Sequence, residues 1–159
     1  MGIAHAVMDR VMDDHFKYEA TEDMQALLGT VTDDVLHDQV GNPMGARRGK
    51  AEMTGFYEVL FADTEPTNVT PLNRLYGESF AVDDVMWEGY TTGKPFGLEG
   101  PRTLTGFRLM HVFEFRDGLI SRENVWVDYQ ALQAQLSAAQ SGGAVPAEHV
   151  NNDVAEHAS

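Results

Sequence analysis

Two ionisable side chains, His111 and Glu123, stand inside apolar, strand-like segments near the C-terminal end of the sequence. If both enter one apolar wall, desolvation raises the pKa of the carboxyl and lowers that of the imidazole, while their mutual attraction acts in the opposite direction. A carboxyl–imidazole pair tuned near neutrality can move a proton between two carbons, or between carbon and oxygen. The same pair could instead be a buried ion pair that only links two strands. The sequence leaves both interpretations open.

The segment that carries both residues, 103–129, is predicted to form a β-hairpin closed at Asp117-Gly118, a tight-turn dipeptide. A two-residue loop pairs His111 with Asn124, whereas a three-residue loop with the glycine left-handed pairs His111 with Glu123. We favour the second register because it gathers the apolar side chains on one face. That face comprises Phe107, Leu109, Phe113, Phe115, Val125 and Val127, and the opposite face of the return strand comprises Ile120, Arg122, Asn124 and Trp126.

Two further histidines precede the hairpin. His37 and Gln39 share one face of a short predicted strand, 35–40, where they could donate to a substrate oxygen or position a water molecule. Equally, His37 could be a half-exposed strand residue. His15 stands where the apolar stripe of a predicted helix over 3–19 ends. Its simplest interpretation is a histidine near the helix C-terminus that interacts favourably with the helix dipole, and contact with a substrate is the alternative.

Aromatic and apolar residues could form the walls of a pocket around these groups. Tyr18, Tyr57 and Trp87 are candidates, although aromatic residues at such spacings also fill ordinary cores. Leu109 and Val125 would complete the lining from the hairpin. His15, His37 and His111 lie on three separate elements, so a metal site is geometrically conceivable. No helix carries ligands at a spacing such as His-x-x-x-His, and we therefore predict no metal.

The composition narrows the possible partners. The net charge is −14, from 25 acidic and 11 basic residues. This field repels a phosphate backbone and anionic lipid, which argues against nucleic-acid and membrane binding and favours an apolar or weakly polar small molecule. There is no cysteine, so disulfides and thiolate chemistry are excluded. The first residues lack the pattern of a signal peptide, and no apolar run approaches the roughly 20 residues that span a bilayer. We expect a cytoplasmic protein.

The order of the predicted elements indicates an α+β fold with a mostly antiparallel sheet wrapped against helices. The first half contains a helix over 3–19, a short helix with Thr21 as its N-cap, a strand over 35–40, and an amphipathic helix with Met53, Phe56, Tyr57, Leu60 and Phe61 on its stripe. The second half contains a strand over about 69–77 that Pro71 marks as an edge or a bulge, a strand over 79–92, a glycine-rich connection over 93–100, the hairpin, and a helix over 130–140. Residues 141–159 should be a flexible tail.

Three segments carry a family resemblance: LGTVTDDVLHDQV, RRGKAEMTGFYEVLF and FGLEGPRTLTGFRLMHVFEFRDGLISRENVWVDY. Together they resemble the SnoaL-like polyketide cyclases of the nuclear transport factor two-like superfamily, to which ketosteroid isomerase and limonene epoxide hydrolase also belong. The resemblance implies one SnoaL-like domain over 1–140 followed by the tail, 141–159. It implies a cone, in which a strongly curved mixed or antiparallel sheet packs on N-terminal helices and encloses a pocket. It also implies a homodimer and no cofactor.

Residue by residue, the resemblance supports some roles and weakens others. His111 looks like the pocket histidine on the penultimate strand of the polyketide cyclases. Val125 stands where those enzymes carry an acid/base aspartate, so Glu123 is the remaining carboxylate of that strand with the same parity. His37 and Gln39 fall where the epoxide hydrolases hold the catalytic water with a tyrosine and an asparagine.

The leading hypothesis is therefore a cofactor-independent isomerase, cyclase or lyase in which His111 and Glu123 are the acid/base groups and His37 is a polar anchor. One alternative is an epoxide-hydrolase-like addition of water, with His37 and Gln39 holding the water. Another is a non-catalytic binding protein for an apolar metabolite. A last one is a dimerisation module that uses the outer sheet face around Trp126.

Overall fold

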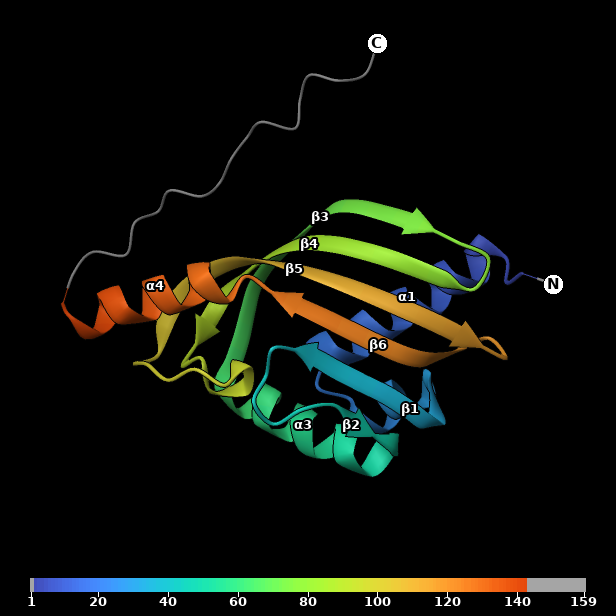
Figure 1. Cartoon of the computed structure of the whole chain (residues 1–159), viewed down its shortest axis with the longest axis horizontal. Helices are drawn as coiled ribbons and strands as arrows, with labels where there is room; N and C mark the ends of the chain where they lie inside the picture. The colour runs from blue at the N-terminus through green and yellow to red at the C-terminus, as the bar shows by residue number, and fades with distance from the viewer. Residues whose placement is uncertain (1, 143–159) are drawn as a thin grey trace, which may run out of the picture.

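Six strands form one sheet in the order β2 (Arg47–Arg48), β1 (Val31–Val40), β6 (Leu119–Val127), β5 (Thr103–Arg116), β4 (Phe80–Thr91) and β3 (Thr64–Tyr76), as Figure 1 shows. β1 and β6 run parallel and the other neighbours antiparallel, so the sheet is mixed. The helices are α1 (His5–Ala20), α2 (Met24–Gly29), α3 (Gly49–Asp63) and α4 (Tyr129–Gln140), with a 3-10 turn η1 (Lys94–Phe96). This computed structural model describes residues 2–142, so most of the predicted tail, 141–159, lies outside the described residues.

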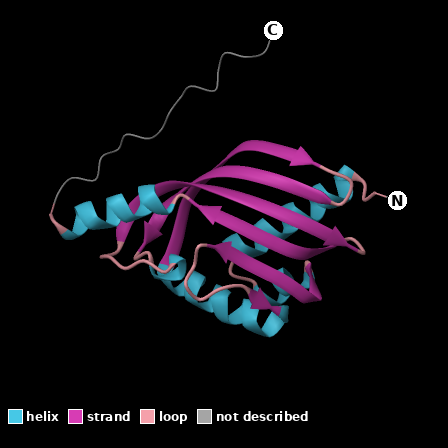
Figure 2. Cartoon of the chain, viewed as in Figure 1, coloured by secondary structure: helices cyan, strands magenta, loops and turns pink. Residues whose placement is uncertain are grey.

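The sheet is strongly curved, and α1 and α3 lie against its concave side (Figure 2). The amphipathic pattern of both helices explains this arrangement, because each buries one apolar stripe. The stripes supply Met8, Val11 and Met12 from α1 and Met53, Phe56, Tyr57 and Leu60 from α3 to a single core. The cone-like α+β architecture that the sequence predicts is confirmed.

Local boundaries differ from the predicted ones at the N-terminal side. Asp23, not Thr21, caps α2: its carboxylate accepts a hydrogen bond from the backbone N–H of Ala26 at 3.1 Å. β1 begins at Val31, four residues earlier than predicted, because Val31 pairs with Ile120 of β6. The pairing with a neighbouring strand thus overrides the turn propensity of the Thr-Asp-Asp sequence that follows Val31.

The β5–β6 hairpin combines features of both predicted registers. The turn is a two-residue loop, with Asp117 at φ 55° and Gly118 at φ 77°, as a type I′ turn requires. The favoured three-residue loop is therefore wrong. Ser121 is then the extra residue of a β-bulge, because Glu114 pairs with Arg122 and Phe115 pairs with Ile120.

The bulge has two consequences for the inner face. First, His111 pairs with Val125, so the predicted direct pairing of His111 with Glu123 is wrong; Glu123 lies opposite Phe113. A shift of two residues keeps the parity, and His111 and Glu123 still share one face of the sheet. Second, Ile120, predicted to face outward, is fully buried, because the extra residue turns it to the core side.

β3 is the edge strand of the sheet, as Pro71 indicated, and the register shifts next to Pro66 and next to Pro71. It begins at Thr64, five residues before the predicted start. Most of its side chains are exposed because helices cover little of it. At the opposite end of the chain, Gln135 of α4 holds this helix to β5, donating to the carbonyl of Gly106 at 2.7 Å and accepting from its N–H at 2.9 Å. Within residues 2–142, no helix is long and apolar enough to cross a membrane.

Candidate active site

A cavity of about 450 Å³ lies between the concave face of the sheet and the helices α1 and α3. Its volume is within the range of small-molecule sites. Most of the wall is apolar: Phe16, Phe56, Leu60, Phe61, Val85, Trp87, Phe96, Leu109 and Val125 line it. The cavity is open to solvent beside β3, because inward-facing residues of that strand, such as Val69, line it and yet remain exposed. A site of this shape excludes most water from a small apolar ligand.

Glu123 of β6 is the polar centre of the cavity wall. Its side chain is almost fully buried, and Oε2 lies 3.4 Å from His15 Nε2 and 3.9 Å from His37 Nε2. Burial alone would raise the pKa of Glu123, but the neighbouring imidazoles, that of His15 above all, outweigh burial and lower it to about 2. Glu123 is therefore a carboxylate throughout the neutral range. It acts as a fixed negative charge rather than as a proton carrier.

His15 is the cation that neutralises this charge. Its Nδ1 lies 2.7 Å from Thr30 Oγ1, and the Thr30 hydroxyl donates to the carbonyl of Leu27 at 2.6 Å. Because a hydroxyl has only one proton, Thr30 must accept a hydrogen bond from His15 Nδ1–H. The other nitrogen, Nε2, then faces the hydroxyl of Tyr57 at 3.1 Å and the carboxylate of Glu123. Burial opposes protonation, but Glu123 outweighs burial and raises the pKa of His15 above its ordinary value, which favours the imidazolium form.

The main interpretation of His15 as a residue at a helix C-terminus is wrong, because the side chain is fully buried and bonds to other elements. Nor does His15 line the cavity. It contacts two residues that do line it, Tyr57 and Glu123. Its place in the network is that of a supporting charge within the wall.

His37 and His111 line the cavity as neutral imidazoles, because burial lowers the pKa of each below its ordinary value. The ring of His37 packs on Phe56, with ring centres 4.4 Å apart, and the ring of His111 lies parallel to that of Phe113 at 5.6 Å. In both histidines Nδ1 is buried and has no hydrogen-bond partner among the described residues. Neutral, incompletely bonded imidazoles beside a carboxylate are suited to accept a proton or to donate a hydrogen bond.

The remaining predicted binding residues divide into two groups. Gln39, Tyr57, Trp87, Leu109 and Val125 all line the cavity. Gln39 is oriented by Asn42, whose side-chain amide donates to Gln39 Oε1 at 2.6 Å. Tyr18 does not line the cavity: it lies beside a separate surface hollow together with Arg10 and Asp14. These three residues follow one another at intervals of four on α1, which turns them away from the stripe that faces the sheet.

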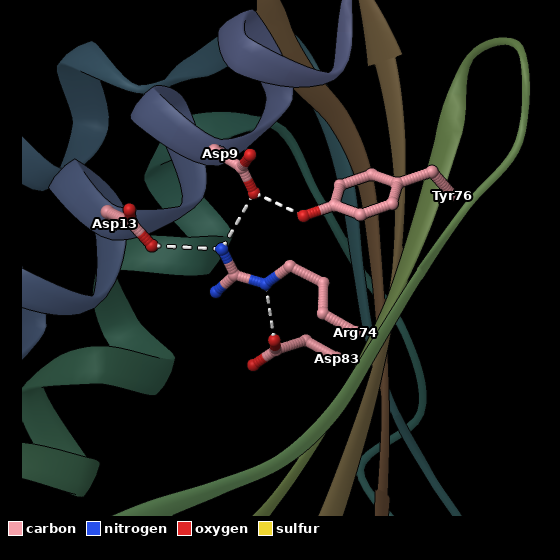
Figure 3. Close-up of polar contacts among 5 residues, drawn as sticks. All are labelled: Asp9, Asp13, Arg74, Tyr76 and Asp83. Carbon is pink, nitrogen blue, oxygen red and sulfur yellow. Dashed lines mark hydrogen bonds and ion pairs between the residues drawn. The ribbon is translucent and has the colours of Figure 1, made fainter. Parts of the chain in front are cut away.

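A charged cluster at one end of the cavity was not predicted (Figure 3). Arg74 of β3 donates from Nε to Asp83 of β4 at 2.6 Å, and from one terminal nitrogen to Asp9 and Asp13 of α1 at 2.9 and 3.0 Å. The hydroxyl of Tyr76 donates to Asp9 at 2.5 Å. The cluster joins the edge strand to α1. Asp83 has the parity of Val85 and Trp87 on the same strand, and this parity could have identified it from the sequence.

Glu19 of α1 also lines the cavity and was missed. Burial, together with the charge of Glu123, raises its pKa to about 7, although His15 acts in the opposite direction. Over the described part of the chain, no group of three or more histidine and carboxylate side chains is arranged as a metal site.

A curved six-stranded mixed sheet, closed by helices over a deep cavity, defines the cone of the nuclear transport factor two-like proteins. The sequence itself matches the model of the SnoaL-like domain over residues 12–123, and the chain belongs to this family. None of the curated proteins matches the sequence significantly.

Solved structures share the fold at low identity. TsrD from Streptomyces laurentii superposes with a TM-score of 0.71 at 18% identity, over 86% of this chain and 98% of its own. A candidate polyketide cyclase from Silicibacter sp. gives 0.69 at 22% identity, over 82% and 96%. An LEH-like epoxide hydrolase of M. tuberculosis gives a TM-score of 0.61 at 16% identity, over 84% of this chain and 89% of its own.

Proposed function

We propose that the protein is a cofactor-independent enzyme that transfers protons on an apolar or weakly polar small molecule, as an isomerase, cyclase or lyase. One observation carries the proposal: a neutral imidazole, His111, and a permanently ionised carboxylate, Glu123, share the wall of an apolar cavity. Membership of the SnoaL-like family is consistent with this class of chemistry.

In the proposed mechanism His111 is the general base. Its neutral ring accepts a proton from a carbon next to a carbonyl group of the bound molecule, and becomes an imidazolium. The negative charges of Glu123 and of Asp83, which faces His111 across the β4–β5 pairing, stabilise this imidazolium. The imidazolium then returns the proton to another carbon. His37, within 3.9 Å of Glu123, anchors a ligand oxygen.

The proposal changes the role of Glu123 from that expected. The sequence predicts that it shares in carrying the proton, but a carboxylate with a pKa of about 2 is a weak base near neutrality. Its value to the reaction is electrostatic: it stabilises positive charge on the imidazoles around it in a site of low dielectric.

A deuterium-exchange experiment tests the proposal. Cyclic β,γ-unsaturated ketones of graded size are incubated with the protein in D₂O, and NMR follows deuterium at the carbon next to the carbonyl while absorbance follows the conjugated isomer. We expect His111→Gln to lower the exchange rate by about 10²- to 10⁴-fold. His5→Gln, on the exposed side of α1, is the matched control and should keep the full rate.

The outcomes separate the candidate functions. If Trp87 fluorescence reports binding of the ketones but no exchange occurs above buffer, the protein is a binding protein. If His111→Gln exchanges as fast as the unchanged protein, His111 is not the base. If no ketone of the series binds, the proposed substrate class is wrong.

Addition of water to an epoxide is the second candidate. His37 and Gln39 both line the cavity from β1, at the positions where the resemblance implies residues that hold water. Val125, which pairs with Gln39 across the sheet, offers no carboxyl group there. Incubation of 1,2-epoxides in ¹⁸O-water discriminates: a labelled diol whose formation requires His37 and Gln39 supports hydrolysis, and unchanged epoxide contradicts it.

We also propose that the protein is a homodimer that pairs through the outer sheet face. That face exposes several large apolar side chains of three neighbouring strands: Tyr90, Leu104, Met110 and Trp126. Tyr90 pairs with Leu104 and Met110 pairs with Trp126, and exposed apolar side chains grouped in this way are typical of an interface.

A further inference from the structure

Glu19 is a carboxyl group for which neither the fold nor the proposed mechanism gives a role. It lies on α1, one turn after His15, and lines the cavity. Within residues 2–142 its side-chain carboxyl group has neither an ion-pair nor a hydrogen-bond partner, and only its backbone carbonyl accepts a hydrogen bond, from the N–H of Glu22. A partly buried carboxyl group without a partner is costly when ionised, so its retention in a ligand cavity needs a reason.

The cations near Glu19 are engaged elsewhere. The positive charge of His15 is taken by Glu123 at 3.4 Å. Lys17 lines the cavity as well, but its amine lies over the ring of Tyr18, 5.4 Å from the ring centre, and forms no ion pair with Glu19. Arg74 is held by three aspartates, Asp9, Asp13 and Asp83. No cation within residues 2–142 therefore forms an ion pair with the carboxyl group of Glu19.

The other charges that face Glu19 disfavour its ionisation. From β6, the carboxylate of Glu123 repels a second negative charge. From α3, Tyr57 lines the same cavity, and its neutral hydroxyl lies 3.1 Å from His15 Nε2. Asp13 and Glu22 add two further carboxylates to the α1 side of the cavity. Of all these groups, only His15 acts in favour of the charged form.

We propose that Glu19 is the acid partner of His111: it binds a ligand as a neutral carboxylic acid and donates its proton to the ligand's carbonyl oxygen. This inference rests on the proposed function. In the forward step His111 takes the proton from carbon, the electron pair moves to the carbonyl group, and the oxygen takes the proton of Glu19. The products are a neutral enol, a Glu19 carboxylate and a His111 imidazolium. In the return step the imidazolium protonates another carbon and the enol proton goes back to Glu19.

The surroundings of the two carboxyl groups shift their pKa values in opposite directions. The pKa of Glu123 is lowered to about 2, whereas that of Glu19 is raised to about 7. Two titratable groups whose environments separate their pKa values in this way typically hold different roles in a proton-transfer site. The inference also defines the ligand: a neutral molecule with a carbonyl oxygen. A carboxylate-bearing ligand would instead be repelled by the carboxylates of Glu22 and Glu123, which line the same cavity.

The test compares Glu19→Gln with Glu58→Gln, a control on the exposed face of α3. The probe is a bicyclic enone that cannot isomerise, and its dissociation constant is measured by Trp87 fluorescence from about pH 5.5 to about pH 9. If only the neutral acid binds, the dissociation constant of the unchanged protein should rise about tenfold for each pH unit above the pKa of Glu19. Glu58→Gln should follow the same curve, and Glu19→Gln should lose this pH dependence.

The result that overturns the inference is a dissociation constant that does not depend on pH in the unchanged protein, or one whose pH dependence survives in Glu19→Gln. A ¹³C titration of the Glu19 carboxyl, which needs no ligand, should show a midpoint near neutrality; a midpoint below about 5 contradicts the inference. This inference and the proposed function can fail separately. If binding follows the expected pH curve but deuterium exchange is absent, Glu19 is a hydrogen-bond donor for the ligand and the proton-transfer step is wrong.

Discussion

Replacing His15 with glutamine removes the positive charge that lies 3.4 Å from Glu123 and keeps a polar side chain beside Thr30. In the unchanged protein the pKa of Glu123 is depressed from 4.5 to about 2. At about 1.4 kcal/mol for each factor of ten, this depression corresponds to roughly 3 kcal/mol of folding free energy at neutral pH. In other proteins, removing one partner of a buried ion pair lowers the free energy of unfolding by about 3–5 kcal/mol. We therefore expect His15→Gln to lose about 3 kcal/mol at pH 7.

The loss should depend on pH in a defined direction. A carboxyl group with a depressed folded-state pKa contributes stability above its unfolded-state value of 4.5 and loses it as the pH falls through about 2. Without His15, burial raises the pKa of Glu123 and this contribution disappears. The stability difference between His15→Gln and the unchanged protein should be largest at neutral pH and should shrink as the pH falls below the raised pKa.

Glu123→Gln should cost less than His15→Gln. Without the carboxylate His15 becomes neutral, and its two hydrogen bonds persist: Nδ1–H still donates to Thr30, and Nε2 now accepts from the hydroxyl of Tyr57. No buried charge is left unpaired, so a loss of about 1–2 kcal/mol is expected. Urea unfolding at pH 7 and at about pH 4, followed by tryptophan fluorescence, measures both variants, with His5→Gln as the control. If Glu123→Gln is the more destabilised variant at pH 7, or if the loss in His15→Gln is the same at both pH values, the buried ion pair is refuted.

Three other substitutions test separate parts of the structure. Glu19→Gln should stabilise the protein by about 1–3 kcal/mol at pH 8 and leave its stability unchanged near pH 4. The reason is that a carboxyl group with a raised pKa costs folding free energy as the pH rises from 4.5 through about 7. Equal stability of the variant and the unchanged protein in urea at pH 8 contradicts this prediction. Gly93→Ala should lower the free energy of unfolding, measured by calorimetry, by about 1–3 kcal/mol, because Gly93 has φ 82° and a Cβ there would lie 2.5 Å from a side chain of α4. Gly106→Ala should cost less, because the nearest atom to a Cβ at that position is 3.6 Å away. Trp126→Asp should convert a dimer into a monomer in light scattering while Met44→Asp does not, and an unchanged mass would exclude this face.

The alternation of apolar and polar residues predicts the faces of the strands, because successive side chains of a strand point to opposite sides of the sheet. Parity places His37 and Gln39 together on one strand face and His111 and Glu123 together on another, and all four residues line the cavity. The bulge at Ser121 could not be predicted from the pattern of apolar and polar residues. A serine between Ile120 and Arg122 is compatible with a regular strand and with a bulge alike. The correct face was therefore predictable and the cross-strand partner was not.

Helix residues were harder to place than strand residues. The cavity-facing side of α1 depends on how the helix docks, and neighbouring positions differ by about 100° around its axis. Tyr18 was predicted to line the cavity and Glu19, the next residue, was overlooked, yet only Glu19 lines it. The cluster around Arg74 needed the β3–β4 pairing and the position of α1 together, and a sequence pattern contains neither.

The balance of charges around Glu123 limits the chemistry that this cavity can perform. His15 already neutralises Glu123, so protonation of His111 adds a second buried imidazolium that only Asp83 and the remaining field of Glu123 can offset. His111 is consequently a weak base, its pKa lowered mainly by burial. A weak base removes a proton from carbon fast only if the carbonyl oxygen is protonated or strongly hydrogen-bonded as the negative charge develops. The site therefore requires an acid facing the base, and Glu19 is the carboxyl group of the cavity whose pKa, about 7, allows it to be that acid at neutral pH.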